Sequence, residues 1–309
     1  MRAPQGTDTG RRALLAAAAC ALAWPAQAWP ARAAWPGASV RIVVAYPAGG
    51  VSDMVARALA EQLAQQWGTA VIVDNRPGAS GTVALELLAR SAPDGRTLVF
   101  AAATAVGLAA ASVTPVAGVM RTPMLLVGTP ALKAADFEGM LAEARGMPGG
   151  IRWATTGEGT TGHAVLQRIE QATRIPIVHV PYKGGGQQLN DALAGHFELL
   201  STNVAPLQLQ ALRAGRLKAL AVGAPQRLAA LPDVPTLAQL GHAQANLDSL
   251  FGLFAPPQMA PALAQRINAA VAQALRAPAI RSRLAAASNQ PFDGSAAEFA
   301  QQVMREAGR

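Results

Sequence analysis

Short apolar runs alternate with amphipathic stretches along most of the chain, and turns rich in glycine or proline separate them. The first run, residues 40–46, is apolar apart from Arg41 and has the length of a buried strand. The turn at residues 47–50 ends it, and Ser52 is expected to cap a helix whose apolar positions recur over residues 54–63. This order of strand, glycine turn and helix predicts a βα unit.

The same order repeats downstream and predicts an α/β fold, with mostly parallel sheets that carry helices on both faces. Further strands are expected at residues 70–73, 97–102, 124–127, 151–154, 177–180, 197–200, 218–222 and 250–255. Further helices are expected at residues 82–90, 134–145, 261–276, 278–287 and 295–307.

The pattern restarts after residue 127, and an apolar run at 250–255 precedes a helical tail. Two crossings between lobes are therefore predicted, with residues 34–127 and 250–309 in the first lobe and residues 128–249 in the second. A first lobe built from both ends of the chain implies a hinge and a cleft between the lobes.

The first 33 residues have the three regions of an export signal. Arg11 and Arg12 form the charged head, residues 13–23 the apolar stretch, and cleavage is expected after Ala28 or Ala33. The apolar stretch spans about 16 Å as a helix, whereas a bilayer core is about 30 Å thick, so it is too short for a membrane anchor. Export to the periplasm is predicted, by the Sec or the twin-arginine route.

The composition excludes several classes of protein. A hydrophobic content of 51% and a charged content of 14% argue for a well-buried globular chain. The net charge of +8 is scattered and includes no basic run interleaved with aromatic residues, so a nucleic-acid partner is not expected. Cys20, the single cysteine, lies inside the predicted signal, which excludes disulfides and thiol chemistry from the mature chain.

The turn after the first strand is the first candidate binding site. Backbone N–H groups and the positive end of the following helix converge there, which suits a carboxylate or a phosphate without a charged side chain. The alternative is a tight βα turn that binds nothing. The candidate ligand-binding residues of this turn are Tyr46, Ala48, Gly49, Gly50 and Asp53.

A second turn, at residues 155–162, lies between a strand and a helix of the other predicted lobe and is rich in hydroxyls and glycines. It suits the other side of the same ligand, because ligands of open α/β sheets bind beyond the carboxyl ends of the strands. The alternative is a flexible connector with Thr161 as helix cap. The candidate residues here are Thr155, Thr156, Gly157, Thr160 and His163.

Lys183 and Gly184 follow the strand at 177–180, and Asn203 follows the strand at 197–200, so both segments can reach the same cleft. Lys183 precedes its glycines, whereas a Walker loop needs the lysine after them. For this segment a surface turn is the alternative.

The sequence lacks a catalytic constellation. The histidines have no metal-ligand spacing and no nearby acid at helical register, and no nucleophile elbow is present, so neither an enzyme nor a metal or cofactor site is predicted. The histidines concerned are His163, His179, His196 and His242.

Several ordered motifs resemble the Bug family, the TctC-like periplasmic solute-binding proteins of tripartite tricarboxylate transporters. The resemblance covers nearly all of the mature chain. Its motifs are Arg41-Ile42-Val43-Val44, Tyr46-Pro47-Ala48-Gly49-Gly50 with Asp53, Asn75-Arg76-Pro77-Gly78-Ala79, Ala92-Pro93-Asp94-Gly95, Val180-Pro181-Tyr182-Lys183-Gly184, Ala214-Gly215-Arg216-Leu217 and Leu231-Pro232-Asp233-Val234-Pro235-Thr236.

The resemblance implies a Venus-flytrap clamp of the type II kind, with mixed sheets flanked by helices, that closes over one small carboxylate. The ligand would be a di- or tricarboxylate, an amino acid or an aromatic acid. The partners would be membrane transporter subunits or a sensor kinase, and the protein would be a monomer. Ala102, Ala103 and Thr104 match positions that face the family's cleft, and Asp53 is expected to order the first turn rather than to touch the anion.

Three departures from the family pattern bear on the ligand. The stretch between Thr104 and Pro115 is shorter, Ser201 and Thr202 stand where relatives often carry Phe-Asp, and the tail stops earlier, at Arg309. A changed ligand or a non-binding interaction protein is therefore an alternative. A periplasmic hydrolase or isomerase with a histidine base is another, although a nucleophile and an acid are missing.

Overall fold

The computed structural model describes residues 35–308 and divides the chain into two compact units, Met1–Gly37 and Ala38–Arg309. The predicted export signal lies outside the described residues. All elements discussed below belong to the second unit.

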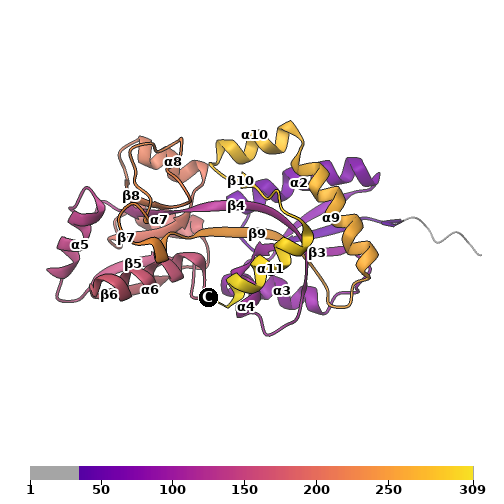
Figure 1. Cartoon of the computed structure of the whole chain (residues 1–309), viewed down its shortest axis with the longest axis horizontal. Helices are drawn as coiled ribbons and strands as arrows, with labels where there is room; N and C mark the ends of the chain where they lie inside the picture. Colours follow the sequence, from indigo (N-terminus) through magenta and orange to yellow (C-terminus); the bar gives the residue numbers. More distant parts are fainter. Residues whose placement is uncertain (1–34, 309) are drawn as a thin grey trace, which may run out of the picture. The chain divides into compact units, whose positions relative to one another are not determined.

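A mixed sheet runs through this unit in the strand order β2-β1-β3-β9-β4-β7-β5-β6, with β8 and β10 also paired to β4 (Figure 1). Pairs within β1–β3 and within β5–β7 are parallel, whereas every pair that involves β4 or β9 is antiparallel. The strands are β1 (Val40–Val44), β2 (Val71–Asn75), β3 (Thr97–Ala102), β4 (Thr114–Gly128), β5 (Ile151–Thr155), β6 (Ile177–Pro181), β7 (Leu199–Asn203), β8 (Lys218–Gly223), β9 (Asp248–Ala255) and β10 (Gln290–Pro291).

Helices follow most of the strands, as the alternating pattern predicts. They are α2 (Val51–Trp67), α3 (Thr82–Ala89), α4 (Thr104–Leu108), α5 (Phe137–Arg145), α6 (Thr161–Thr173), α7 (Gly185–Leu193), α8 (Pro206–Arg213), α9 (Pro261–Leu275), α10 (Pro278–Ala286) and α11 (Ala296–Ala307), with 3₁₀ turns η2 (Ala79–Gly81) and η3 (Ala243–Ala245).

The ends of these helices follow capping chemistry. Ser295 accepts from the N–H of Glu298 at the start of α11 and completes a capping box. Two cap predictions are wrong. Gly50, not Ser52, is the N-cap of α2. The helix begins at Val51, so Ser52 already lies inside its first turn. Thr160, not Thr161, caps α6 and accepts from the N–H of His163.

The buried side chains form separate cores at the two ends of the sheet. One cluster draws on residues 43–105 and 250–303 and contains Phe254 and Phe299. Two other clusters draw on residues 124–247 and contain Trp153. These cores support the predicted pair of lobes, and β4 and β9 run side by side from one core to the other (Figure 1).

The strand predicted at residues 124–127 is wrong in length, because β4 covers fifteen residues. Pro115 and Pro123 lie inside it and conceal the strand in the sequence, since proline removes a ladder hydrogen bond. Pro115 sits at a register shift of the ladder, where this loss is tolerated. No pattern in the sequence predicted α4, which follows β3 directly.

No helix within residues 35–308 has both the length and the apolar character needed to cross a membrane.

Candidate functional site

The turn between β1 and α2 is held in shape by Asp53. The N–H of Gly49 and the Nε of Arg57 both donate to Asp53 Oδ2, at 3.0 and 3.1 Å. Burial acts to raise the pKa of Asp53, but hydrogen bonds from Arg57, Gly49 and Asn75 and the charge of Arg57 hold it below its usual value. The carboxylate therefore stays ionised and orders the turn.

Tyr46 closes the end of β1. Its hydroxyl accepts from the N–H of Ala102 at 3.0 Å, and its ring meets the ring of Phe251 edge-on at 5.7 Å. Burial raises the pKa of Tyr46 to about 12, and the hydrogen bond from Ala102 opposes this only in part. The phenol is therefore neutral at physiological pH.

Two hydroxyls of the turn after β5 have partners within the turn itself. Thr155 Oγ1 accepts from the N–H of Gly157 at 3.1 Å and lies 2.8 Å from Nε2 of His179. Thr160 Oγ1 donates to the carbonyl of Gly157 at 2.7 Å while it caps α6. Thr155 is fully buried, so its contact with a histidine provides no accessible nucleophile.

The rings of His163 and His179 are stacked beside this turn, 4.4 Å apart and 16° from parallel. The N–H of Gly159 donates to Nδ1 of His163 at 3.1 Å. Burial lowers the pKa of both rings, and the neighbouring His163 lowers that of His179 further. Both imidazoles are therefore neutral supports of the turn. Among the described residues no group of three or more His, Cys, Asp or Glu side chains could hold a metal ion.

A cavity of about 410 Å³ lies between the two turns and receives the N-termini of three helices, α2, α7 and α8. None of these helices has a side-chain cap, and the N–H groups of a first helical turn have no partner within the helix. α8 offers one donor fewer, because it begins with Pro206. The lining residues are Tyr46, Pro47, Ala48, Gly49, Gly50, Val51, Ser52, Met54, Thr156, Gly184, Gly185, Gly186, Leu189, Thr202, Asn203, Ala205, Pro206, Leu207, Gln208 and Phe251.

About half of the residues expected from the sequence line this cavity. Those that do are Tyr46, Ala48, Gly49, Gly50, Thr156, Gly184 and Asn203. Those outside the lining are Asp53, Ala103, Thr104, Thr155, Gly157, Thr160, His163 and Lys183. Lys183 is exposed, and Ala103 and Thr104 are buried. The contribution of this second group to binding stays a prediction.

Sequence reasoning missed the part of the lining that α8 and β9 supply. Leu207 and Gln208 come from the first turn of α8, and Phe251 comes from the middle of β9. Thr202, near the end of β7, was missed as well. Pro206 at the first helical position, directly after a strand, is a signal that could have revealed α8. Phe251 has no such signal, because its place depends on the pairing of β9 with β3.

The lobes touch one another around the cavity. Ser80 Oγ, from the first lobe, donates to the carbonyl of Glu158 in the second at 3.0 Å. A Cβ atom on Gly184 would lie 3.0 Å from Cγ of Pro47, and one on Gly159 would lie 2.3 Å from Cδ2 of Leu108. The lobes are therefore closed on each other, and glycines of the second lobe make this approach possible.

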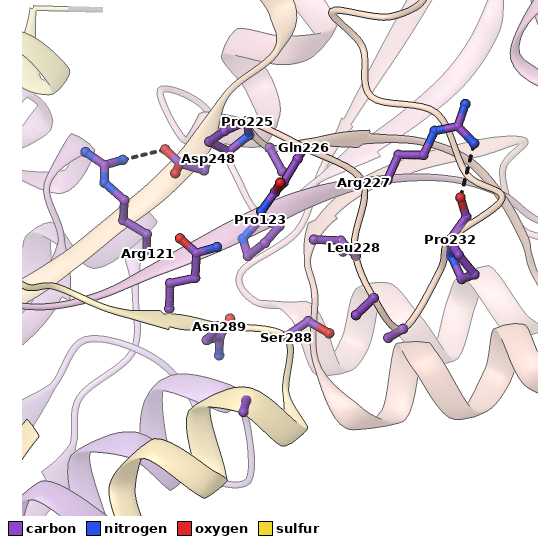
Figure 2. A pocket seen from close by; sticks show the side chains of 15 residues that line it. Arg121, Pro123, Pro225, Gln226, Arg227, Leu228, Pro232, Asp248, Ser288 and Asn289 are labelled. Atoms are coloured by element: carbon purple, nitrogen blue, oxygen red, sulfur yellow. Dashed lines mark hydrogen bonds and ion pairs between the residues drawn. The ribbon is translucent and has the colours of Figure 1, made fainter. Parts of the chain in front are cut away.

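A second cavity, of about 530 Å³, lies where the crossing strands meet α10 and the loop at residues 224–232 (Figure 2). Arg121 forms an ion pair with Asp248, and Arg227 donates to two neutral acceptors, the carbonyl of Pro232 and the side chain of Gln239. The cavity also borders the C-terminal end of α10, where the helix dipole disfavours an anion. The smaller cavity, with its three helix N-termini, is therefore the better site for an anion.

Comparison with known proteins identifies the family to which the chain belongs. The family model described as "Tripartite tricarboxylate transporter family receptor" matches residues 55–309. BugT from Bordetella pertussis is 30% identical over 290 residues, which cover 89% of each chain.

Solved structures from Rhodopseudomonas palustris are similar as well. MatC with bound malate is 28% identical and has a TM-score of 0.81 over 89% of this chain and 98% of its own. A second protein of that organism, with adipate, is 29% identical and has a TM-score of 0.81 over 89% of this chain and 95% of its own.

Proposed function

Because the chain belongs to the tripartite tricarboxylate transporter receptor family, we propose that it is a periplasmic solute-binding protein whose two lobes close over one small carboxylate. The observation that carries the proposal is the meeting of three uncapped helix N-termini at the cavity between the lobes. The resemblance to the Bug family and the two-lobed α/β fold are confirmed by the family match and by the similar structures.

The helix N-termini supply what a carboxylate needs. Each carries a partial positive charge of about half an elementary charge and unpaired N–H donors. A hydrogen bond to a charged group contributes about 1.5–3 kcal/mol, so several converging donors hold an anion without a cationic side chain. Lys183 is exposed and outside the cavity lining, so the proposal gives it no direct contact with the ligand.

The related structures support a carboxylate as the ligand class, since MatC holds malate and its R. palustris counterpart holds adipate. In this proposal the protein releases its ligand unchanged to membrane transporter subunits or to a sensor kinase, acts as a monomer and catalyses no reaction. Export by the Sec or twin-arginine route, with cleavage after Ala28 or Ala33, is part of the proposal. The intact mass of periplasmic protein tests it, and recovery of only the full-length chain from the cytoplasm contradicts it.

Ligand-free protein, prepared by unfolding, dialysis and refolding, provides the test of binding. A panel of mono-, di- and tricarboxylates is screened by thermal denaturation and then by isothermal titration. A ligand at 100 times its Kd adds about 2.7 kcal/mol to the free energy of unfolding, which raises the Tm of a chain of this size by about 4–5 °C. No shift with any carboxylate, or turnover of the bound one seen by NMR, contradicts the proposal.

Two matched variants test whether the backbone holds the ligand. Gly49 and Gly241 have φ angles of +81° and +84° and open space at the Cβ position, but only Gly49 lines the cavity. Valine strains the backbone at both positions, so both variants lose stability. Gly49→Val is expected to lose binding at least tenfold, whereas Gly241→Val and Lys183→Ala keep it within about twofold. Loss of binding in Lys183→Ala alone would replace the backbone cradle with a direct ion pair.

A further inference from the structure

The cavity between the lobes is neutral as well as rich in backbone donors. None of the described residues that line it has an acidic or basic side chain, and its one titratable group, Tyr46, has a pKa of about 12. The nearest acid along α2, Asp53, is engaged by Arg57 and by the turn that it orders. A ligand in this cavity therefore finds partners for an anion but no counter-charge for an ammonium group.

The side chains that line the cavity are largely hydrocarbon, and both lobes and a crossing strand supply them. Val51 and Met54 come from α2, Leu189 and Leu207 from α7 and α8, and Phe251 from β9. Contact with such walls favours a ligand whose middle part is apolar, because the apolar surface of both partners leaves water on binding.

Some polar side chains of the lining already have partners in the protein. Asn203 Oδ1 accepts from Ser249 Oγ at 2.8 Å, and Gln208 Nε2 approaches Thr202 Oγ1 at 3.5 Å. Thr202 and Gln208 are also buried, which limits their freedom to turn toward a new partner. All polar side chains of the lining are neutral, so an ammonium group in the cavity would lose its water without gaining a charged partner.

We infer that the ligand is a carboxylate with a hydrocarbon body, an aliphatic acid or α,ω-diacid rather than an amino acid. The inference rests on the proposed function, which supplies the carboxylate, and adds the chemistry of the rest of the molecule. Met54 and Leu207 are the side chains assigned to this selectivity, since they lie on the cavity and are not part of a buried core cluster.

Isothermal titration of ligand-free protein tests the inference with two sets of acids. The first set extends one chain by single methylenes, from succinate through glutarate and adipate to pimelate. Affinity is expected to rise about fourfold per methylene, the equivalent of about 0.8 kcal/mol, until the cavity is full. The second set keeps the four-carbon skeleton of succinate and adds an amino group, in aspartate. Aspartate is expected to bind at least tenfold more weakly than succinate.

One pair of variants separates the cavity wall from a general effect of the substitution. Met54 lines the cavity, whereas Met304 is 73% exposed on α11 and lies outside the lining. Met54→Gln is expected to reduce the gain per methylene to less than twofold, and Met304→Gln is expected to leave it unchanged.

The possible outcomes distinguish the inference about the body of the ligand from the proposed function as a carboxylate-binding protein. Tighter binding of aspartate than of succinate, or equal affinity across the chain-length series, overturns the inference and leaves the carboxylate receptor intact. An unchanged gain per methylene in Met54→Gln overturns the assignment of the wall. Failure of every acid to bind removes the proposed function and the inference with it.

Discussion

Substitution of Gly159 by alanine tests whether ligand binding requires the lobe contact that the structure shows. Gly159 lies in the turn after β5 with a φ of +69°, and its added Cβ atom would lie 2.3 Å from Cδ2 and 2.8 Å from Cδ1 of Leu108. Such distances are far below van der Waals contact. Either Leu108 moves away or the lobes stay apart.

The Gly159→Ala substitution is expected to have two energetic costs: backbone strain in both the open and the closed state, and overpacking in the closed state only. The left-handed backbone costs an alanine about 1–2 kcal/mol in the folded chain, whether the lobes are open or closed. Overpacking against Leu108 costs about 1–3 kcal/mol and falls on the closed state alone. Because Leu108 is 42% exposed and can move, we expect overpacking to cost about 1–2 kcal/mol, which is a rise of about 5- to 30-fold in Kd.

A double-mutant cycle isolates the second cost. Isothermal titration with the best carboxylate of the screen gives Kd for the parent protein, Gly159→Ala, Leu108→Ala and the double variant, and thermal denaturation without ligand gives their stabilities. The double variant is expected to recover most of the lost affinity, because the methyl group added at position 159 replaces the removed leucine atoms, while its stability stays low. Additive effects on Kd, or a Gly159→Ala protein that binds like the parent, would refute the requirement for this closed contact.

Three further predictions concern charge. Gln208→Glu places a carboxylate on the cavity, and its repulsion of a bound carboxylate, about 3 kcal/mol at about 6 Å, should raise the Kd about 100-fold. The control is Gln187→Glu, at the equivalent but exposed position of α7, which should change the Kd measured by titration by less than threefold. Burial lowers the pKa of His163 and His179, so their contribution to the free energy of unfolding is complete above pH 6.5 and declines below it. Urea unfolding should therefore give a free energy that decreases from pH 7.5 to 5.5. A value that does not change with pH would contradict this. Asp53→Ala removes the acceptor of the Gly49 N–H and the Arg57 side chain, so it should lower the free energy of unfolding by about 1–3 kcal/mol and weaken ligand binding. An unchanged Tm and an unchanged Kd would contradict the proposal that Asp53 orders the turn.

The alternating order of strands and helices made much of the fold predictable from the sequence. β3 has its predicted bounds, and the parallel strands on either side of the crossings lie within three residues of their predicted positions. Local signals failed where neighbours decide the conformation. Pro115 and Pro123 concealed β4, whose continuity depends on pairing with four other strands.

The candidate site was predictable where it depends on glycine turns and less so where it depends on tertiary packing. Gly49, Gly50 and Gly184 line the cavity because a βα turn places backbone at the carboxyl end of its strand. The hydroxyls of Thr155 and Thr160 were expected to face a ligand, but their partners within the turn engage them. The sequence alone does not show that backbone groups of the same turn compete with a ligand for these hydroxyls.

The lobes are joined by two strands of one ladder, which limits the kind of motion that can open the clamp. β4 and β9 pair from Thr114 with Ala255 to Pro123 with Asp248, so hydrogen bonds span the crossing instead of a loose linker. Separation of these strands would leave backbone groups unpaired, whereas a gradual change in twist keeps the ladder intact. We therefore expect the two paired strands to twist and untwist together as one elastic element when the lobes open and close. The amides of these strands should resist hydrogen exchange whether or not ligand is bound, while the turns at the lobe faces become protected only when the clamp is shut.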